Sequence, residues 1–506
     1  MAAAVAAAAA LTLTACSGSS DSNSSSTSAA KSSANLGLLG SVSSFSAADM
    51  EWGNQAPYVQ AVYDTLLRQD TKGAVIAGLA SKWSYNDDQT VLTLTLHDGV
   101  KFTDGTPLNA DAVAKNLIRF RDGASSAKAN LANMADATAV DDTTVKITLK
   151  ESDPGLLIAL AQAAGAVEAP SHFGSADEKT VPLGSGPYEL DAAKSVPGST
   201  YQFTANPDYW DKASQHYDAL TFTVLTDSTA MLNAIKGHQV NFGVIRDNKT
   251  LDQVKSAGYK LVSIQASWVG MLYFDRDGAV NPALGDVRVR QALNYAFDRK
   301  GLLKTVGSGA GTTTTQIFPT TSAAYDPALD NKYSFDPAKA KKLLTEAGYP
   351  NGFALEMPSP PGQDPATNAL IVQQLKDVGV TATFVDAGAN FFPDILAQKY
   401  AVSPFGLAQD PDWTLINFQV APNATFNPFH NADPKIDELI QTIHDSQADE
   451  TTLNAALKEL NTYLVDQAWF GTWYRPDSNF AVDSATTAEP QAGNALPSLW
   501  NIKPAA

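Results

Sequence analysis

Residues of the kinds that carry out chemistry in proteins are scattered along this chain. Six histidines occur without an i, i+4 pair and without the spacing of metal ligands: His97, His172, His216, His238, His430 and His444. The sequence has no Gly-x-Ser-x-Gly elbow, no His-Glu-x-x-His motif, no Gly-Lys-Ser/Thr phosphate loop and no Gly-x-Gly-x-x-Gly loop. We therefore predict a protein that is not an enzyme and has no cofactor and no metal. A metal site assembled from distant histidines remains an alternative.

The only cysteine, Cys16, points to covalent lipidation. The preceding residues are nearly all Ala, Val and Leu and end in Leu13-Thr14-Ala15-Cys16, which resembles a bacterial lipobox. We predict a signal peptide over 1–15, a lipid on Cys16 and a Ser-rich tether over 16–35 that holds the folded part outside the cell membrane. No Lys or Arg precedes the apolar run, so we expect the natural signal to start upstream of Met1. The alternative is an Ala-rich helix with a buried thiol.

Length and composition limit the kind of molecule. A chain of 506 residues is longer than a single hydrophobic core supports, so two or three domains are expected. Hydrophobic residues make up 44% and charged residues 17%, as in ordinary globular proteins. The formal charge of −18 disfavours nucleic acid and anionic membrane surfaces as partners.

Strand and helix signals alternate after residue 36, which is typical of an α/β protein. Thr90–Leu96 alternates Thr with Leu and predicts a strand, and Asp104-Gly105 predicts a tight turn. Asp336 and Pro337 predict the start of a helix that Gly348 ends.

A second helix is predicted after Asp286, with Val289, Ala292, Leu293, Ala296 and Phe297 on one buried face. Its arginines, Arg288, Arg290 and Arg299, are tempting as ligands for an anion. We expect them instead to be solvated or paired locally on the exposed side of the helix.

Several segments in a fixed order resemble the peptide/nickel-type solute-binding receptors of ABC importers, the bacterial extracellular solute-binding proteins of family 5. The segments are Val62-Tyr63-Asp64-Thr65-Leu66-Leu67, Leu79-Ala80-Ser81-Lys82-Trp83, Asp98-Gly99-Val100-Lys101-Phe102-Thr103-Asp104-Gly105-Thr106-Pro107-Leu108, Gly184-Ser185-Gly186-Pro187-Tyr188, Asn206-Pro207-Asp208-Tyr209-Trp210, Asp286-Val287-Arg288-Val289-Arg290-Gln291-Ala292-Leu293 and Ala347-Gly348-Tyr349-Pro350-Asn351-Gly352-Phe353. Most of these residues set turns or fill a core, so they identify the scaffold and leave the ligand open.

The resemblance implies a two-lobed periplasmic-binding-protein-like fold of class II, cluster C type, with an inserted subdomain and a two-strand hinge. Lobe one is expected to comprise 36–60, 184–272 and 481–506, the inserted subdomain 61–183, and lobe two 273–480. The implied function is capture of a small solute, a peptide or a molecule of similar size, between the lobes of a monomer that delivers it to the membrane subunits of an ABC permease. A secreted lipoprotein hydrolase, or a sensor or chaperone on the same scaffold, remains an alternative.

The resemblance also suggests ligand-binding residues. In the peptide-binding branch, an Asp in an Asp-Pro-Asp-like stretch pairs with the ligand's α-ammonium, and Asp410 is the best match here. We expect Trp413 and Phe405 to form an apolar wall, with Trp268 and Trp52 as further wall residues. The alternative is that Asp410 caps the helix after Pro411 and the aromatic residues are core. Whether the ligand is a peptide, metal chelate, opine or sugar stays open.

Overall fold

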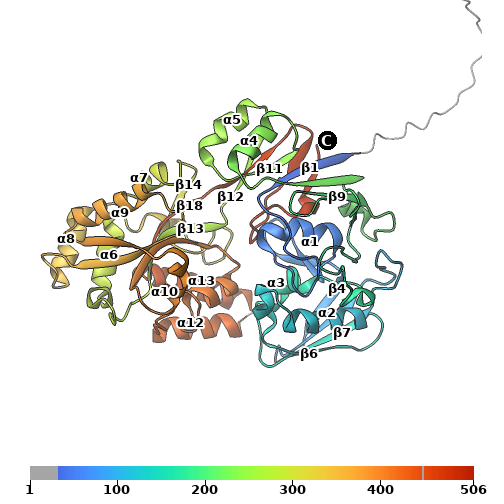
Figure 1. Cartoon of the computed structure of the whole chain (residues 1–506). Helices are drawn as coiled ribbons and strands as arrows, with labels where there is room; N and C mark the ends of the chain where they lie inside the picture. Colours follow the sequence, from blue (N-terminus) through green and yellow to red (C-terminus); the bar gives the residue numbers. More distant parts are fainter. Residues whose placement is uncertain (1–31, 447–448, 506) are drawn as a thin grey trace, which may run out of the picture. The chain divides into compact units, whose positions relative to one another are not determined.

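Strands from distant parts of the sequence assemble into three main sheets in the computed structural model, which describes residues 32–446 and 449–505 (Figure 1). Ser32–Ala506 forms one compact unit. The predicted signal peptide and Cys16 lie outside the described residues. The predicted tether extended to residue 35, but β1 begins at Ser33 and pairs with β10 from Ser33↔Ala219 onward. This part of the prediction is wrong because Ala34 is buried and Asn35 hydrogen bonds to Asn241 and the Gln239 carbonyl.

The first sheet has seven strands that come from both ends and the middle of the chain. Their order is β12 (Lys260–Ile264), β19 (Ser478–Val482), β11 (Phe242–Ile245), β1 (Ser33–Leu38), β10 (Ala219–Val224), β9 (Thr200–Ala205) and β8 (Tyr188–Leu190). The helices α1 (Ala56–Val62), α4 (Ser228–Lys236) and α5 (Leu251–Ser256) accompany this sheet (Figure 1).

The second sheet is antiparallel and belongs to the segment predicted as an inserted subdomain. Its order is β4 (Ala80–Tyr85), β5 (Val91–Leu96), β7 (Thr144–Leu149) and β6 (Met134–Ala139), and α2 (Ala110–Asp122) packs against it. The predicted strand over Thr90–Leu96 is confirmed by β5, whose Leu92, Leu94 and Leu96 are buried. The predicted turn at Asp104-Gly105 lies inside the bridge between Lys101 and Pro107.

The third sheet is the centre of the other half of the unit. Its order is β14 (Gly311–Thr313), β18 (Phe470–Pro476), β13 (Ser267–Tyr273) and β17 (Val402–Ala408), next to a parallel pair, β15 (Ala354–Ser359) and β16 (Thr381–Asp386). The surrounding helices are α6 (Val287–Ala296), α7 (Arg299–Thr305), α8 (Pro337–Glu346), α9 (Pro365–Asp377), α10 (Phe391–Leu396), α11 (Asp412–Leu415), α12 (Pro434–Asp445) and α13 (Glu450–Asp466).

Both predicted helices are present with their predicted first residues. The Asp336 carboxylate accepts a hydrogen bond of 2.9 Å from the Lys339 N–H at the start of α8, and Asp286 accepts one of 2.8 Å from Arg288 N–H at the start of α6. Gly348 follows α8 with a φ of +93°, a conformation that glycine adopts without strain.

The expectation for the arginines holds only for Arg288, which pairs with Asp286 at the surface. The prediction that Arg290 and Arg299 lie on the exposed side is wrong, because both side chains are buried. Arg290 Nη1 donates to the Leu284 carbonyl at 2.7 Å, and Arg299 donates to the carbonyls of Thr472, Asn294 and Tyr333 at 2.7–2.9 Å. From the interior, these guanidinium groups connect helix α6, strand β18 and neighbouring loop segments.

Two short connections join the first sheet to the third. Residues 265–266 lead from β12 to β13, and Asp477 alone leads from β18 to β19. The chain therefore passes twice between the same two sheets, which is the two-strand hinge of the predicted fold class. None of the described helices is long and apolar enough to cross a membrane.

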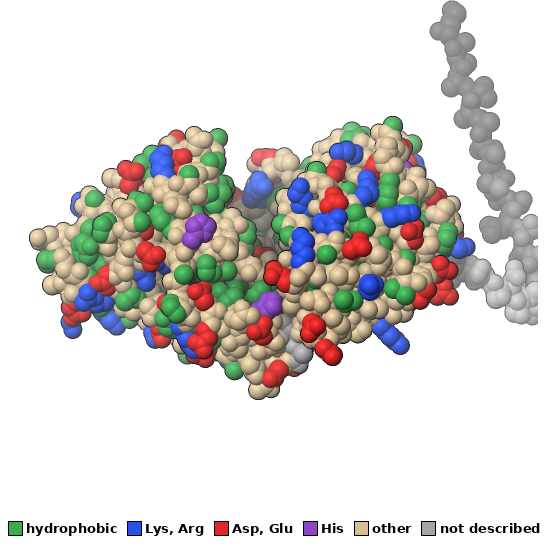
Figure 2. All heavy atoms as spheres, turned by 90° about the horizontal axis from the view of Figure 1, so that it is seen from below, with side chains coloured by type: hydrophobic (Ala, Val, Ile, Leu, Met, Phe, Trp, Pro, Cys, Tyr) green, Lys and Arg blue, Asp and Glu red, His purple; other side chains and the backbone are tan. Residues whose placement is uncertain are grey.

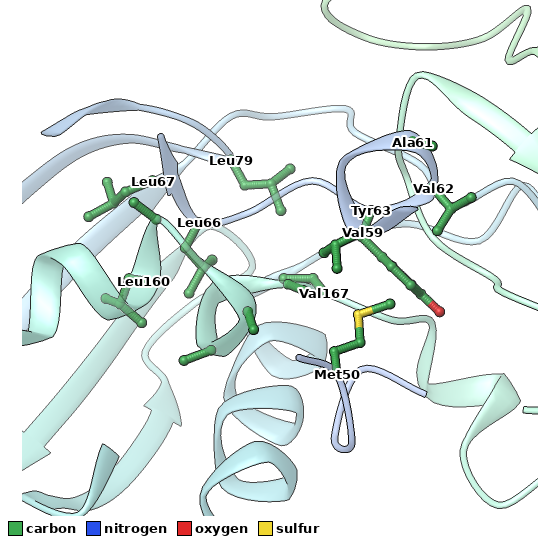
Figure 3. Close-up of a cluster of buried hydrophobic side chains, with 14 of the residues drawn as sticks. Met50, Val59, Ala61, Val62, Tyr63, Leu66, Leu67, Leu79, Leu160 and Val167 are labelled. Atoms are coloured by element: carbon green, nitrogen blue, oxygen red, sulfur yellow. The ribbon is translucent and has the colours of Figure 1, made fainter. Parts of the chain in front are cut away.

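A large apolar core ties the first two sheets together. Figure 3 shows part of it, where Val59 of α1 and Tyr63, its C-cap residue, lie near Val167 and Met50. Leu66, Leu79 and Leu160 have no exposed surface. The segment 61–183 therefore shares one core with the first sheet, while separate clusters fill the half built around the third sheet.

Candidate ligand-binding cleft

A cavity of about 670 Å³ lies between residues 129–162, next to the second sheet, and residues 410–444, next to the third. Figure 2 shows that this face of the molecule is hollowed between its two halves. The cavity wall is mixed: Trp413, Phe418, Ile158 and Ile440 are apolar, and amides and carboxylates provide the rest. Such a wall suits a small solute that has both polar and apolar groups.

Asp410 lies at the edge of this cavity and also lines a neighbouring cavity of about 170 Å³. A third cavity, of about 350 Å³, shares Gln409 and Gly493 with the second and reaches Gln265 and Asp477 in the two hinge connections. The first cavity shares lining residues with the second, and the second shares others with the third, so we describe the three together as the cleft. Gln409, Asp410 and Pro411 stand at its middle.

The Asp410 side chain makes no hydrogen bond or ion pair with the rest of the described chain. The residue that caps α11 is Pro411, without a side-chain cap, so the structure does not give Asp410 the helix-capping role that was the alternative. Removal from water raises the pKa of the Asp410 carboxyl, and no cation of the described part of the chain counters this effect. A partly buried carboxylate without a partner is costly, which makes Asp410 a natural site for a ligand cation.

Asp412 is a second carboxylate in the same stretch. It lines the neighbouring cavity, and burial raises its pKa to about 6, against the opposing effect of a hydrogen bond with Ser322. Asp412 likewise forms no ion pair among the described residues. Two carboxylates two residues apart therefore enter the cleft, and no cation within residues 32–446 or 449–505 neutralises them.

The wall opposite Asp410 is formed by Glu151 and Asp153, from a distant part of the sequence, and His444 connects the two sides. His444 of α12 lines the cavity, and its Nε2 lies 3.1 Å from the Ser152 carbonyl, while Nδ1 lies 2.8 Å from Asp445. Burial lowers the pKa of His444, but the hydrogen bonds to Asp445 and Ser152 outweigh this and raise it. The ring also lies 5.5 Å from that of Trp413. The contact between His444 and the Ser152 carbonyl joins the segment 150–153 to the third-sheet half of the molecule.

The predicted aromatic wall is only partly present. Trp413 lines the cavity, whereas Phe405 lies behind it and contacts Phe426, whose ring is 5.0 Å from that of Phe418. Trp268 was predicted as a wall residue, but it has no exposed surface and donates from Nε1 to Gln419, so it belongs to the core. Trp52 donates to Asn494 and lines none of the three cavities.

Sequence reasoning missed Phe418, His444, Glu151 and Asp153, all of which line the cavity. Phe418 is brought there by a π-helical turn, Ile416–Val420, that follows α11 directly. Such a turn leaves no mark in hydrophobic periodicity, although π-turns occur often at functional sites. The other three residues could not be predicted either, because only the tertiary fold brings Glu151 and Asp153 next to His444.

Comparison with known proteins agrees with this architecture. Residues 74–426 match the model of the bacterial extracellular solute-binding proteins, family 5 Middle. Among curated proteins, the chain is 31% identical over 452 residues to the glutathione-binding protein GsiB of Escherichia coli K12, covering 80% of this chain and 85% of GsiB.

Solved structures share the fold at lower identity. HbpA2 from Haemophilus parasuis superposes with a TM-score of 0.82 at 23% identity, over 94% of this chain and 100% of that one. The murein tripeptide-binding protein MppA, in an unliganded open form, gives 0.80 at 19% identity over 94% and 98% of the two chains. A dipeptide-binding protein from Pseudoalteromonas in complex with Met-Leu gives 0.73 at 21% identity over 94% and 100%.

The α/β fold with two hinge connections and a cleft is that of the cluster C periplasmic binding proteins. The chain belongs to the bacterial extracellular solute-binding proteins of family 5. It is therefore the extracytoplasmic substrate-binding component of an ABC importer, a class that binds its solute without catalysing a reaction.

Proposed function

We propose that this receptor captures a peptide-like solute in the cleft and holds the solute's ammonium group against Asp410. The observation that carries the proposal is the Asp410 carboxylate itself, which lines two adjoining cavities and has no ion-pair partner among the residues that the structure describes. An ammonium makes a charge-assisted hydrogen bond with such a group, whereas a neutral solute leaves the cost of its burial in place.

The remainder of the cavity wall suits peptides that differ in their side chains. Trp413, Phe418 and Ile158 offer apolar area, and Asn130, Asn133 and Asn417 offer amides that donate or accept. The names of the similar proteins point the same way, since they refer to glutathione, a murein tripeptide and a dipeptide.

The division of the chain and its anchorage are part of the proposal. Lobe one would comprise 36–60, 184–272 and 481–506 with 61–183 inserted, and lobe two 273–480. The lobes would close over the solute by bending at the connections 265–266 and 477, and the closed form would engage the permease. Cys16 would carry the lipid that anchors the cleaved protein to the membrane.

Calorimetry with a defined peptide panel tests the Asp410 anchor. The panel contains Met-Leu, Ala-Ala-Ala and glutathione, each with a free and an acetylated N-terminus. We expect Asp410→Asn to weaken binding of a free-amine peptide by about 1–3 kcal/mol while the melting temperature stays nearly unchanged. Acetylation of the peptide should cost a similar amount with the wild type and little with the variant. Equal affinities of wild type and Asp410→Asn would contradict the anchor and favour a neutral solute such as a sugar.

A further inference from the structure

We infer that the cleft selects solutes of net positive charge, such as peptides with a basic side chain, and discriminates against anionic peptides. This inference rests on the proposed function and specifies the class of solute. It does not follow from the names of the similar proteins, because glutathione carries two carboxylates and one ammonium.

The charges that line the cleft are unequal in sign. The three cavities are lined by five carboxylates, Glu151, Asp153, Asp410, Asp412 and Asp477. The only Lys or Arg among the described residues that line them is Lys72, which is exposed at the edge of the small cavity. In the 670 Å³ cavity itself, three carboxylates face the solute and neither Lys nor Arg does.

His444 does not correct this imbalance for a ligand carboxylate. Both of its ring nitrogens already face oxygen atoms, those of Asp445 and the Ser152 carbonyl. An N–H that donates to these oxygens is not available to a solute. A ligand carboxylate in this cavity would therefore meet amides but no free cationic donor among the described side chains.

The carboxylates lie on both walls of the cavity. Asp410 comes from the loop before α11, whereas Glu151 and Asp153 come from the segment that leads into α3 (Leu156–Leu160). Asp153 accepts a hydrogen bond of 2.9 Å from the Gly155 N–H and a further one from Asn133, and His444 is the cationic side chain whose charge acts on Asp153 and Glu151. Neither carboxylate pairs with a Lys or Arg among the described residues. A solute with an ammonium at Asp410 and a second cation toward Glu151 and Asp153 would satisfy both walls.

The electrostatic cost of closing the cleft differs between cationic and anionic solutes. Closing the cleft removes water from these carboxylates. Asp410 and Asp412 have no cationic neighbour among the described residues, and on the other wall His444 offsets only part of the charge of Glu151 and Asp153. A cationic solute neutralises the remaining charge, whereas an anionic one adds to the repulsion. The formal charge of −18 adds a long-range field of the same sign. Neutralisation by the solute is thus the simplest way for these carboxylates to stay ionised in the closed cleft.

The experiment uses the full chain and a mixture of tripeptides with free ends. The mixture contains Ala-X-Ala and Ala-Ala-X with X as Lys, Gln or Glu, together with glutathione, all equimolar. After incubation and rapid desalting, retained peptides are quantified by mass spectrometry. We expect Lys-bearing peptides to be retained about tenfold over their Gln counterparts. Peptides with Glu and glutathione should stay at background.

A double variant and its control test whether Glu151 and Asp153 cause the preference for Lys-bearing peptides. In Glu151→Gln/Asp153→Asn, the preference for Lys over Gln should fall at least about fivefold while Gln-bearing peptides are retained as before. The control Asp88→Asn/Glu346→Gln changes net charge equally at two exposed carboxylates outside the three cavities and should keep the wild-type preference.

The outcomes separate this inference from the proposed function. Preferential retention of Glu-bearing peptides or of glutathione would overturn the charge inference and leave peptide capture intact. The same preference in the Glu151→Gln/Asp153→Asn variant as in the wild type would also overturn it. Retention of no peptide of any charge would overturn the proposed function, and with it this inference.

Discussion

At the scale of single residues, the stretch Asp410-Pro411-Asp412 determines what the cleft can bind. Pro411 caps α11 and has no N–H that could bond to Asp410, so the carboxylate is left for another partner. Burial raises the pKa of both carboxyl groups, and that of Asp412 reaches about 6. The empty cleft thus carries an electrostatic cost that a bound cation removes.

This cost predicts a pH dependence of binding. The pKa of Asp412 lies near 6 in the folded protein, above its ordinary 3.8, so burial favours the protonated carboxyl. The contribution of Asp412 to the free energy of unfolding is therefore present at low pH and is lost as pH rises through about 6. A cationic peptide favours the ionised form, so its affinity should rise with pH up to about 6 and level off above 7. Calorimetry should find binding about tenfold weaker at pH 5 than at pH 7.5.

Protonation of His444 also weakens the binding of a cationic peptide at low pH, because it places a positive charge in the cavity. The variant Asp412→Asn separates the two effects: if Asp412 is responsible, most of the difference between pH 5 and pH 7.5 disappears. An affinity that is unchanged over this range in the wild type would contradict a role for ionised Asp412.

At the scale of elements, buried arginines hold the half around the third sheet together. Arg299 at the start of α7 donates to carbonyls of β18, of α6 and of the loop at Tyr333, and burial lowers its pKa to about 10. No carboxylate pairs with it among the described residues, so its charge is met by backbone dipoles. Removing the guanidinium leaves several buried carbonyls without donors.

We expect Arg299→Met to lower the free energy of unfolding by about 3 kcal/mol or more, because these carbonyls lose their partners. Arg288→Ala removes an arginine from the preceding helix, where it forms an exposed pair with Asp286, and should cost less than about 1 kcal/mol. Urea unfolding followed by circular dichroism measures both. Similar losses for the two variants would mean that the hydrogen bonds of Arg299 contribute little.

The helices and strands were predictable where a local signal existed. Asp336 and Asp286 fixed helix starts, and the Thr/Leu alternation fixed β5, because capping and pleating act within a few residues. The burial of Arg290 and Arg299 was not predictable, since helical periodicity places a side chain on a face but does not say what packs over it. The π-helical turn that exposes Phe418 had no signal in the sequence either.

The cleft was predictable only at its Asp410 side. The match of Asp410 to a family stretch pointed to one wall. Glu151 and Asp153 form the other wall only because α12, with His444, packs near the loop that precedes α3. Trp268 was misassigned for a related reason: alternation along β13 does not show which of its faces is covered by the helix–loop segment around Gln419.

At the scale of the whole molecule, closure over a solute is the expected response to binding. Only two short connections, 265–266 and 477, join the first and third sheets, so bending there moves large bodies with little change inside them. A solute that contacts both sides of the cleft favours the closed form by its differential affinity. Small-angle scattering should show a smaller radius of gyration with a saturating retained peptide. An unchanged radius would argue for a rigid site.

The proposed anchor is tested by fractionation of cells. Cys16→Ser removes the thiol that would carry the lipid, so the protein should move from the membrane fraction to the soluble extracytoplasmic fraction. The variant Ser17→Ala, at the adjacent position, serves as the control and should stay with the membrane. A Cys16→Ser protein that remains membrane-bound would contradict anchorage at this residue.

Mass spectrometry of the solutes that co-purify with the protein tests the central claim most directly. Wild type and Asp410→Asn are expressed and purified side by side under native conditions, and released small molecules are compared, with Asp88→Asn as the control for lost charge. We predict an amine-bearing, peptide-like solute with wild type and control that is depleted at least about tenfold from Asp410→Asn. The same solute retained equally by all three proteins, or a solute without a cationic group, would contradict the claim.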